Sequence, residues 1–256
     1  MKRSILFILS VLLTAGTLKA QNVRFPTSGV IEFEKSINMY ALIKKNSESA
    51  QSNYMRDYLD NYKKSNPQFK ILKSTLLFST EKSLYTPQIP AERNTSFFDD
   101  LSTEQPNIIF TDLKNNTSIT QKKIYEETFL VKDSTRKINW KLTSEVRTIA
   151  GYDCRRANAI ILDSIYVVAF YTDKIPVSGG PESFSGLPGM ILGVALPHEN
   201  ITWFAKSVTD KTVPAEEFKA PVKGKATDHK GLVKTINDAL KSWGTYAQTA
   251  LKAFML

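Results

Sequence analysis

The feature that most constrains the fold of this chain is the run Gly186-Leu187-Pro188-Gly189, which stands directly before the apolar stretch Met190–Leu196. Proline fixes φ at the value wanted at the second position of a tight turn, and glycine tolerates the positive φ wanted at the third. The four residues that begin at Leu187 are therefore predicted to form a type II turn. Gly186 is expected at a bulge or a close backbone approach. The turn would lead into a buried strand.

Alternating and apolar runs on either side of this turn predict a β-rich domain. The predicted strands are 29–40, 69–80, 83–85, 107–113, 118–123, 126–131, 138–142, 157–162, 165–171, 190–196 and 201–207. In the run 138–142, Ile138, Trp140 and Leu142 are expected to point inward. Short turn signals such as Asp163-Ser164 predict antiparallel hairpins. The predicted fold class is α+β, with a predominantly antiparallel, curved β-sheet that forms a half-barrel or an open barrel-like structure.

Two segments carry helical periodicity instead. Tyrosines and apolar residues recur on one face of residues 48–64, which predicts one inserted helix. From Asp228, a suitable N-cap, apolar residues recur at helical spacing and predict a long C-terminal amphipathic helix over 228–252. We expect this helix to cover the second face of the strands 157–162 and 165–171, because those strands are apolar almost throughout.

The first twenty residues have the pattern of a secretory signal peptide. Lys2 and Arg3 precede the apolar run Ile5–Leu13, and small or polar residues follow up to Ala20. The predicted organisation is a signal peptide, 1–20, followed by one β-rich domain, 21–256. Gln21 and not a cysteine stands directly after the predicted cleavage site, so we expect an exported protein, periplasmic or associated with the outer membrane, that is not a lipoprotein.

The charge pattern argues against nucleic-acid binding, and the hydropathy pattern argues against a transmembrane segment. Loss of Lys2, Arg3 and Lys19 with the signal peptide lowers the formal charge from +9 to +6. The remaining lysines are scattered and form neither an arginine-rich arm nor a basic stripe, so nucleic-acid binding is not expected. The apolar run near the N-terminus is too short to span a membrane, and no second such run exists, so no transmembrane segment is expected.

Four separated blocks of sequence carry a resemblance to a known family. They are Ile149–Cys154, Ala169–Pro176, Gly180-Pro181 and Gly186–Leu192. In this order they resemble the GLPGLI family, a group of secreted proteins of the Bacteroidetes. Met190 stands where that family usually has Leu, and Phe170 stands where Trp is common. The resemblance covers about 138–205 and implies secretion. It implies no catalytic residue, because the family has no assigned activity.

The residues singled out are therefore structural. They are Gly180, Pro181, Gly186, Leu187, Pro188, Gly189 and Cys154. A lone cysteine excludes an internal disulfide, and its neighbours predict a strand, so Cys154 is expected to be a buried structural residue. A reactive thiol, or a nucleophilic pair of Cys154 with His198, is the alternative.

Neither a metal nor a cofactor is expected. His198 and His229 are the only histidines, and a metal site needs several ligands. The glycines between 179 and 189 match neither a phosphate-binding loop nor a dinucleotide fingerprint.

Two functions remain open. The first is a non-catalytic envelope protein, a module that binds a ligand or a partner such as a lipid, a peptide or an outer-membrane protein. The second is a secreted hydrolase whose site is not recognisable from sequence. An apolar cavity under the helices would favour a lipid carrier, whereas a polar cleft with convergent ionisable groups would favour the hydrolase. The long, proline-containing loop 86–106 is expected to be functional or mobile.

Overall fold

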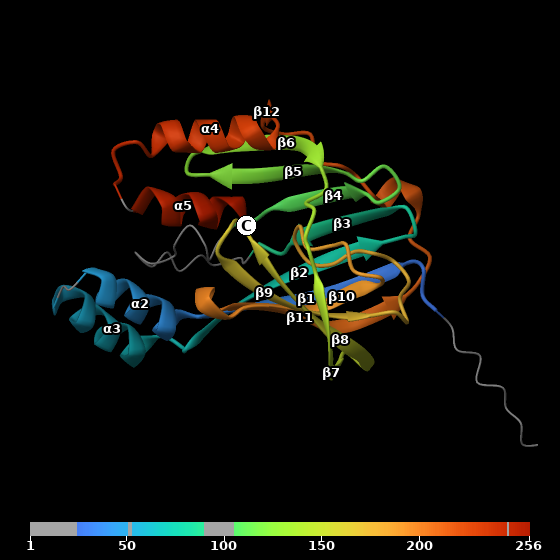
Figure 1. Ribbon diagram of the computed structural model, residues 1–256, viewed down its shortest axis with the longest axis horizontal. Helices are drawn as coiled ribbons and strands as arrows, with labels where there is room; N and C mark the ends of the chain where they lie inside the picture. The colour runs from blue at the N-terminus through green and yellow to red at the C-terminus, as the bar shows by residue number, and fades with distance from the viewer. Residues whose placement is uncertain (1–24, 51–52, 90–104, 245) are drawn as a thin grey trace, which may run out of the picture.

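The computed structural model describes residues 25–50, 53–89, 105–244 and 246–256. They form one 12-stranded sheet in the order β12-β6-β5-β4-β3-β2-β1-β11-β10-β9-β8-β7 (Figure 1). The strands are β1 (Gly29–Asn38), β2 (Phe69–Phe78), β3 (Lys82–Pro87), β4 (Ile108–Asp112), β5 (Thr117–Ile124), β6 (Glu127–Ser134), β7 (Lys141–Ile149), β8 (Tyr152–Ile161), β9 (Ile165–Thr172), β10 (Met190–Leu196), β11 (Ile201–Asp210) and β12 (Lys225–Thr227). The helices are α2 (Met39–Ala50), α3 (Asn53–Ser65), α4 (His229–Ala239) and α5 (Tyr246–Met255), with 3₁₀ turns η2 (Pro197–Glu199) and η3 (Ala215–Glu217). The predicted signal peptide, 1–20, and most of the loop 86–106 lie outside the described residues.

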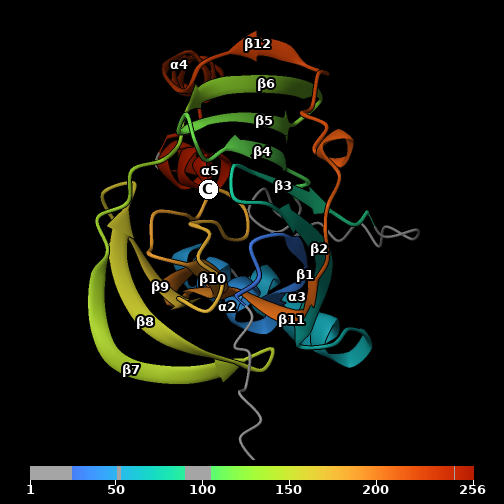
Figure 2. The same cartoon turned by 90° about the vertical axis from the view of Figure 1, so that its right-hand side faces the viewer.

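The predicted fold class, an α+β half-barrel or open barrel-like sheet, is wrong. The structure has a single large mixed sheet, in which β12 pairs with β6 in parallel while the other neighbouring strands pair antiparallel. The sheet bends but does not close, and β12 and β7 are its two edges (Figure 2). Closure would need a second strand against β7, but Leu142 and Val146 in β7 remain 58% exposed each.

The predicted long C-terminal helix over 228–252 is also wrong, because two shorter helices stand in its place. Asp228 is the N-cap, as predicted, and its side chain accepts a hydrogen bond from Gly231 N–H. α4 ends at Ala239, and Gly244 takes a left-handed conformation (φ 57°), which an uninterrupted helix does not contain. The apolar spacing continues across this break because both helices pack on one cluster with β5 and β6.

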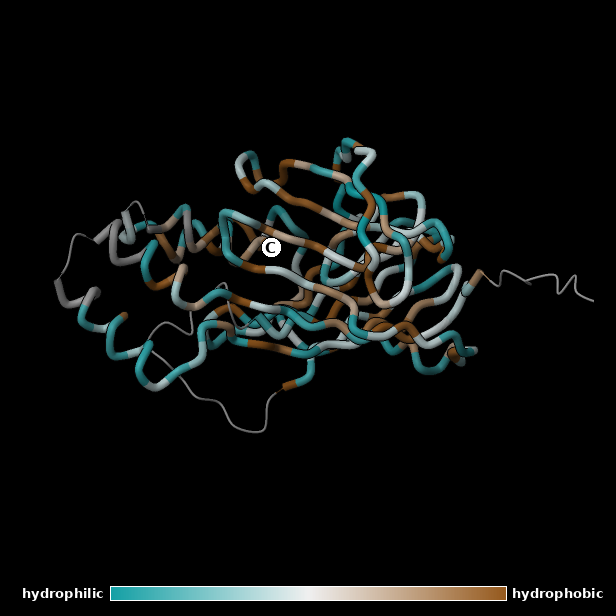
Figure 3. The backbone as a smooth tube through the Cα atoms, turned by 90° about the horizontal axis from the view of Figure 1, so that it is seen from below, coloured by the Kyte–Doolittle hydropathy of each residue, from teal (hydrophilic) through white to brown (hydrophobic). Residues whose placement is uncertain are grey.

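The single helix predicted over 48–64 is instead a pair, α2 and α3. α2 starts directly after β1, where Asn38 Oδ1 accepts a hydrogen bond from Ala41 N–H. Ile43 of α2 and Leu59 of α3 are buried against each other. The two helices project from one end of the sheet, and that end is largely hydrophilic (Figure 3). The side chains of Tyr54 and Met55 lie outside the described residues.

The predicted hairpins 157–162/165–171 and 190–196/201–207 correspond to β8/β9 and β10/β11. Their second face is not covered by the C-terminal helices, which pack at the β5–β6 end. The segment 173–189 covers the central strands instead. Its Phe184 and Leu187 join one apolar cluster, and Ile175 and Val177 join another.

The strand predicted at 138–142 begins only at Lys141. Residues 135–140, here called the crossing segment, run from β6 near one edge of the sheet to β7 at the other edge (Figures 1 and 2). Ile138 and Trp140 of this segment pack on the core as predicted, but Leu142 points outward. No helix in the described part of the chain is long and apolar enough to cross a membrane.

Candidate ligand-binding site

Charged side chains lie inside the molecule where alternation places them on the core face of their strands. In β1, Lys35 stands between the buried residues Phe33 and Ile37 and is only 6% exposed. In β5, Lys122 has the same parity as the buried Ile124 and is also 6% exposed. Strand alternation therefore turns both ammonium groups inward, where an unpaired charge is costly.

Glu182 is the acid that compensates these cations. It lies in the segment 173–189, is buried, and has φ 52°, a left-handed conformation that costs a non-glycine residue energy. Its Oε2 accepts a hydrogen bond from Asn107 Nδ2 at 3.3 Å. Burial raises the pKa of the Glu182 carboxyl, and the charges of Lys35 and Lys122 oppose that rise. We call Lys35, Asn107, Lys122, Arg136 and Glu182 the polar cluster.

Lys122 is held within the polar cluster by two acceptors. Its Nζ donates to the carbonyl of Phe254 at 2.5 Å and to Gln105 Oε1 at 3.2 Å. Burial lowers the pKa of Lys122 to about 7, with Arg136 and Lys35 adding to the effect and Glu182 opposing it. Lys122 is therefore an amine that changes charge near neutral pH.

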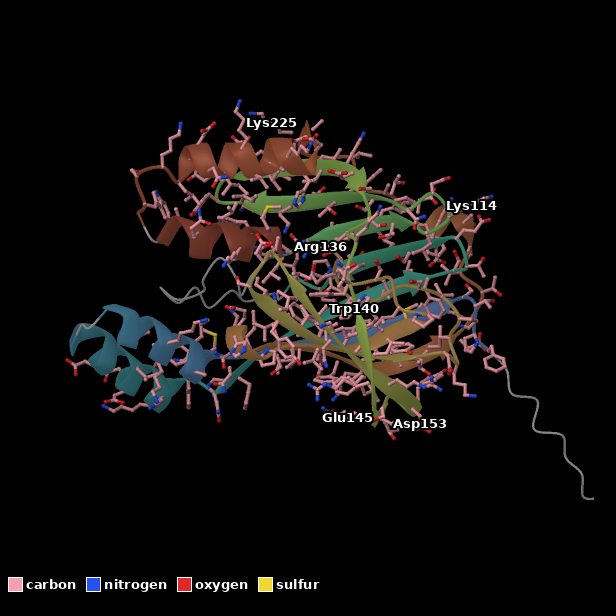
Figure 4. The ribbon with its side chains drawn as sticks, viewed as in Figure 1. Lys114, Arg136, Trp140, Glu145, Asp153 and Lys225 are labelled. Carbon is pink, nitrogen blue, oxygen red and sulfur yellow. The ribbon has the colours of Figure 1, made fainter. Side chains whose placement is uncertain are left out.

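Three side chains donate hydrogen bonds to successive backbone carbonyl groups at the end of α5. Gln105 Nε2 donates to Ala253 O at 2.7 Å, Lys122 Nζ donates to Phe254 O, and Arg136 Nη2 donates to Met255 O. The last carbonyls of a helix have no partner within the helix and carry its partial negative charge, so cations stabilise them. Figure 4 shows Arg136 next to the end of α5.

Beside the polar cluster lies a partly open pocket of about 740 Å³, here called the interior pocket. Its walls come from β4, β5, β6, the crossing segment, the β8–β9 turn, the start of α4 and the end of α5. Asn107, Lys122, Arg136 and Ser183 line it, whereas Glu182 does not. Its walls combine hydroxyl, amide and cationic groups with apolar side chains such as Ile109, Ile160 and Leu232, so the pocket is not the uniformly apolar cavity that a lipid carrier would show.

The start of α4 adds no free donor at His229, because an aspartate of the pocket wall already occupies it. His229 N–H donates to Asp133 Oδ2 at 3.0 Å, and Ser134 N–H donates to Asp133 Oδ1 at 2.7 Å. These hydrogen bonds, the one from His229 first, lower the pKa of the Asp133 carboxyl. Asp133 is thus a structural acid that fixes α4 to β6.

Three residues of the interior pocket carry buried polar atoms that lack a hydrogen-bond partner among the described residues. The atoms are Arg136 Nη1, Asn107 Oδ1 and Ser183 Oγ. A buried polar atom without a partner costs about 1–3 kcal/mol, so each such atom calls for an explanation. All three residues line the interior pocket, which makes this pocket the candidate site, although the three atoms themselves are covered by neighbouring protein atoms.

The residues predicted as structural shape the loop beside the site. Gly189 has φ 147°, and a Cβ there would lie 2.1 Å from Thr172 O, so only glycine fits. The predicted type II turn is wrong in detail: Gly189 N–H bonds to Leu187 O across Pro188, and Met190 N–H bonds to Ile175 O. Gly186 has φ 91°, its N–H donates to Ser178 Oγ at 3.1 Å, and a Cβ added there would meet only the Trp140 ring, at 3.7 Å, so the close backbone approach expected at Gly186 is not found.

The other predicted structural residues are buried. Gly180 and Pro181 lead into Glu182, and Cys154 in β8 is fully buried. Burial raises the pKa of the Cys154 thiol to about 12, and its Sγ contacts Tyr152 O at 3.4 Å. His198 lies instead beside the Tyr166 ring. The described residues contain no group of three or more His, Cys, Asp or Glu side chains that could hold a metal ion.

Sequence reasoning missed the polar cluster, although a signal was present. A lysine at an inward position of an otherwise alternating strand is anomalous, and Lys35 follows Ile31 and Phe33 at the same parity. Glu182 likewise stands between Pro181 and the apolar part of a glycine-rich loop. What the sequence lacked was the pairing that brings these distant residues together.

Comparisons with known proteins concern the overall fold and one short stretch of the sequence. Residues 161–193, which include the Gly186–Gly189 run, match the model of a family described as "Protein of unknown function (Porph_ging)". A sequence search of curated proteins finds no match. Two crystal forms of PNGF-II are similar in structure. In space group C2 the TM-score is 0.51 at 15% identity, covering 80% of this chain and 31% of that one. In space group P21 the TM-score is 0.51 at 17% identity, covering 82% of this chain and 33% of that one.

The chain therefore spans about a third of the length of PNGF-II. At this level of identity the likeness concerns the fold alone, and a shared fold does not establish a shared function. The class that fold and site define is a single-sheet protein with a partly open pocket of mixed polar and apolar lining.

Proposed function

We propose that this protein is a non-catalytic module that binds a small polar ligand in the interior pocket. The observation that carries the proposal is a partly open pocket of about 740 Å³ whose wall includes the cationic side chains of Lys122 and Arg136 and the hydroxyl groups of Ser118 and Thr120. Pockets of roughly 300–1,000 Å³ with a few convergent polar groups are the usual sites for small molecules. The cationic and hydroxyl groups of the wall favour a ligand that carries polar groups over a purely apolar lipid.

The location of the protein and its family are part of the same proposal. Residues 1–20 support export to the periplasm or the outer membrane, and the family match over 161–193 supports a place in the GLPGLI family. Cell fractionation, with determination of the N-terminus of the exported form, tests the location. An exported form that retains residues 1–20 would contradict it.

Binding is tested by protein-detected NMR with a chemically diverse fragment set. We expect saturable shifts at residues of the interior pocket. Thr120→Trp, which places an indole into the pocket from β5, should abolish them. The matched control is Lys123→Trp, which places the same ring on the exposed face of β5 and should leave the shifts unchanged. Absence of saturable shifts at the pocket in the wild type would contradict the proposal.

A secreted hydrolase is the second candidate, and one observation favours it: Lys122 and Glu182, both buried, have shifted pKa values close to a polar pocket. The geometry fits a structural role better, because Glu182 does not line the pocket and Lys122 Nζ already donates to two acceptors. Release of product from glycan or peptide substrates, lost in Glu182→Gln, would establish the hydrolase instead.

A further inference from the structure

We propose that α5 is a latch on the interior pocket, a helix that opens from the sheet as one unit while the strands stay folded. Met255 at the end of α5 and Leu256 directly after it line the pocket, so a movement of this helix changes the shape of the pocket. The inference goes beyond the proposed function, because it concerns a motion of the helix and holds whether or not a ligand binds.

The last turn of α5 is held to the rest of the molecule by side chains and not by backbone pairing. Gln105, Lys122 and Arg136 each donate a hydrogen bond to one of the carbonyl groups of residues 253–255. The backbone hydrogen bonds of a helix lie within the helix itself. α5 can therefore leave the sheet without breaking any strand ladder, at the loss of these side-chain contacts and of its apolar packing.

Two of these contacts bury a cation, and opening returns both cations to water. Burial lowers the pKa of Lys122 to about 7, and burial also lowers the pKa of Arg136. Both shifts reflect the free-energy cost of removing a charged group from water. When α5 leaves, hydration of the two cations offsets part of the loss of their hydrogen bonds to the helix. The polar contacts therefore oppose opening only weakly.

The apolar packing of α5 is less extensive than that of the central strands. Among its described side chains, Ala250, Phe254 and Met255 are buried, in one cluster with residues of β5 and β6. In β9, by contrast, every residue except Tyr166 is buried. The link to α4 contains Gly244, where an added Cβ would meet nothing within 4 Å, so the backbone has room to turn. Elements with few buried apolar contacts open at a lower free energy than the core.

The test is alkylation of buried thiols by N-ethylmaleimide in Ala250→Cys, followed by peptide mass spectrometry. The introduced thiol reports the opening of α5, because Ala250 is only 1% exposed. Cys154, fully buried in β8, reports global unfolding in the same molecule. Each rate is divided by that of the same thiol in the urea-unfolded chain. We expect the introduced thiol to react roughly tenfold faster than Cys154 or more. Urea should accelerate Cys154 more steeply, because global unfolding exposes more surface.

Two substitutions in the Ala250→Cys background separate the latch from a general loss of stability. Arg136→Met removes the hydrogen bond to Met255 O and should accelerate the introduced thiol several-fold. Ile31→Val creates a small cavity in β1, far along the sheet from α5, and weakens the closed and open forms equally. It should accelerate Cys154 several-fold and leave the introduced thiol unchanged.

Lys252→Met is the matched control on α5 itself. It removes an exposed hydrogen bond to Ser164 Oγ and should change neither rate by more than about twofold. Hydrogen exchange of the α5 and β9 amides in the wild type gives the same comparison if a substituted chain does not fold.

Equal normalised rates of the two thiols overturn the inference, since α5 would then leave only when the whole chain unfolds. So does an unchanged rate of the introduced thiol in folded Arg136→Met, or its acceleration by Ile31→Val to the same extent as Cys154. None of these results affects the proposed function, which fragment binding tests separately.

Discussion

Strands β9 and β10 lie in a half of the sheet where almost every side chain is buried and apolar, whereas β5 and β6 face a pocket lined with hydroxyl and charged groups. Both halves belong to the same continuous sheet. The first is covered by the segment 173–189, which fills its side with Phe184, Leu187 and Ile175. The second is covered by α4 and α5, which pack on β5 and β6 without filling the space beside them.

The difference shows how one sheet can support both a closely packed apolar core and a candidate site. Burial of one large apolar side chain stabilises the fold by roughly 1.5–3 kcal/mol, and the β9–β10 half collects many such contributions. That surplus offsets the cost of buried charges and unpaired polar atoms in the other half. The polar cluster lies at the boundary, where Lys35 stands between Phe33 of one apolar cluster and Ile37 of the other.

The largest loss of stability is expected from a substitution at Gly189, beside the apolar half of the sheet. In Gly189→Val a branched side chain would meet Thr172 O at a φ that valine resists, so we expect no folded protein. Circular dichroism and urea denaturation measure this. Gly151→Ala is the control, because Gly151 also has positive φ (84°) but open space around its Cβ, so it should cost about 1–2 kcal/mol. A folded Gly189→Val with wild-type stability would contradict the close approach.

A smaller loss of stability is expected from a substitution at Glu182, in the polar cluster at the boundary between the two halves. Glu182→Gln removes the acid that faces Lys35 and Lys122, and loss of one partner from a buried set of charges costs about 3–5 kcal/mol. The matched control, Glu199→Gln, breaks the exposed ion pair with Lys45 and should cost less than about 1 kcal/mol. Equal unfolding free energies of the two variants would show that Glu182 is not the compensating charge.

The smallest effect is a pH dependence of stability that originates in the polar half. Lys122 has a pKa of about 7 in the folded state and an ordinary value near 10.5 when unfolded. Between these values the unfolded chain binds one more proton, so stability rises with pH, by about 2 kcal/mol from pH 7 to pH 9. Urea denaturation of wild type and Lys122→Met across this range measures the difference. Parallel pH profiles would mean that Lys122 is not desolvated.

Most of the individual strands could be predicted from local patterns, whereas their order in the sheet was not predicted, and the errors have local causes. The hairpins β8/β9 and β10/β11 were predictable because each joins two apolar runs through a short turn. The C-terminal helix was predicted as one because apolar spacing persists on both sides of Gly244. Spacing reports which face is buried, not whether the backbone between the buried residues is continuous. The edge position of β12 was not predictable, since a three-residue strand carries no periodic signal.

The site was out of reach of the sequence for a different reason. The three pocket residues lie in different parts of the chain. Arg136 is on the crossing segment, Asn107 directly precedes β4, and Ser183 is in the segment 173–189. None of them belongs to a sequence motif. Their convergence depends on a connection from β6 to β7 that spans the sheet. A pattern in the sequence reports neighbours along a strand or helix, whereas this site is made by three segments that meet only in the folded chain.

The end of α5 is held by hydrogen bonds from Gln105, Lys122 and Arg136 to the carbonyls of Ala253, Phe254 and Met255. These bonds have a consequence for how the protein folds. These contacts join residues 119 to 148 positions apart. Contacts between such distant residues form late, because the intervening chain must lose its freedom first. During synthesis, therefore, the wall of the pocket is completed only after residues 253–255 have left the ribosome, whereas the hairpins of the apolar half are able to form earlier.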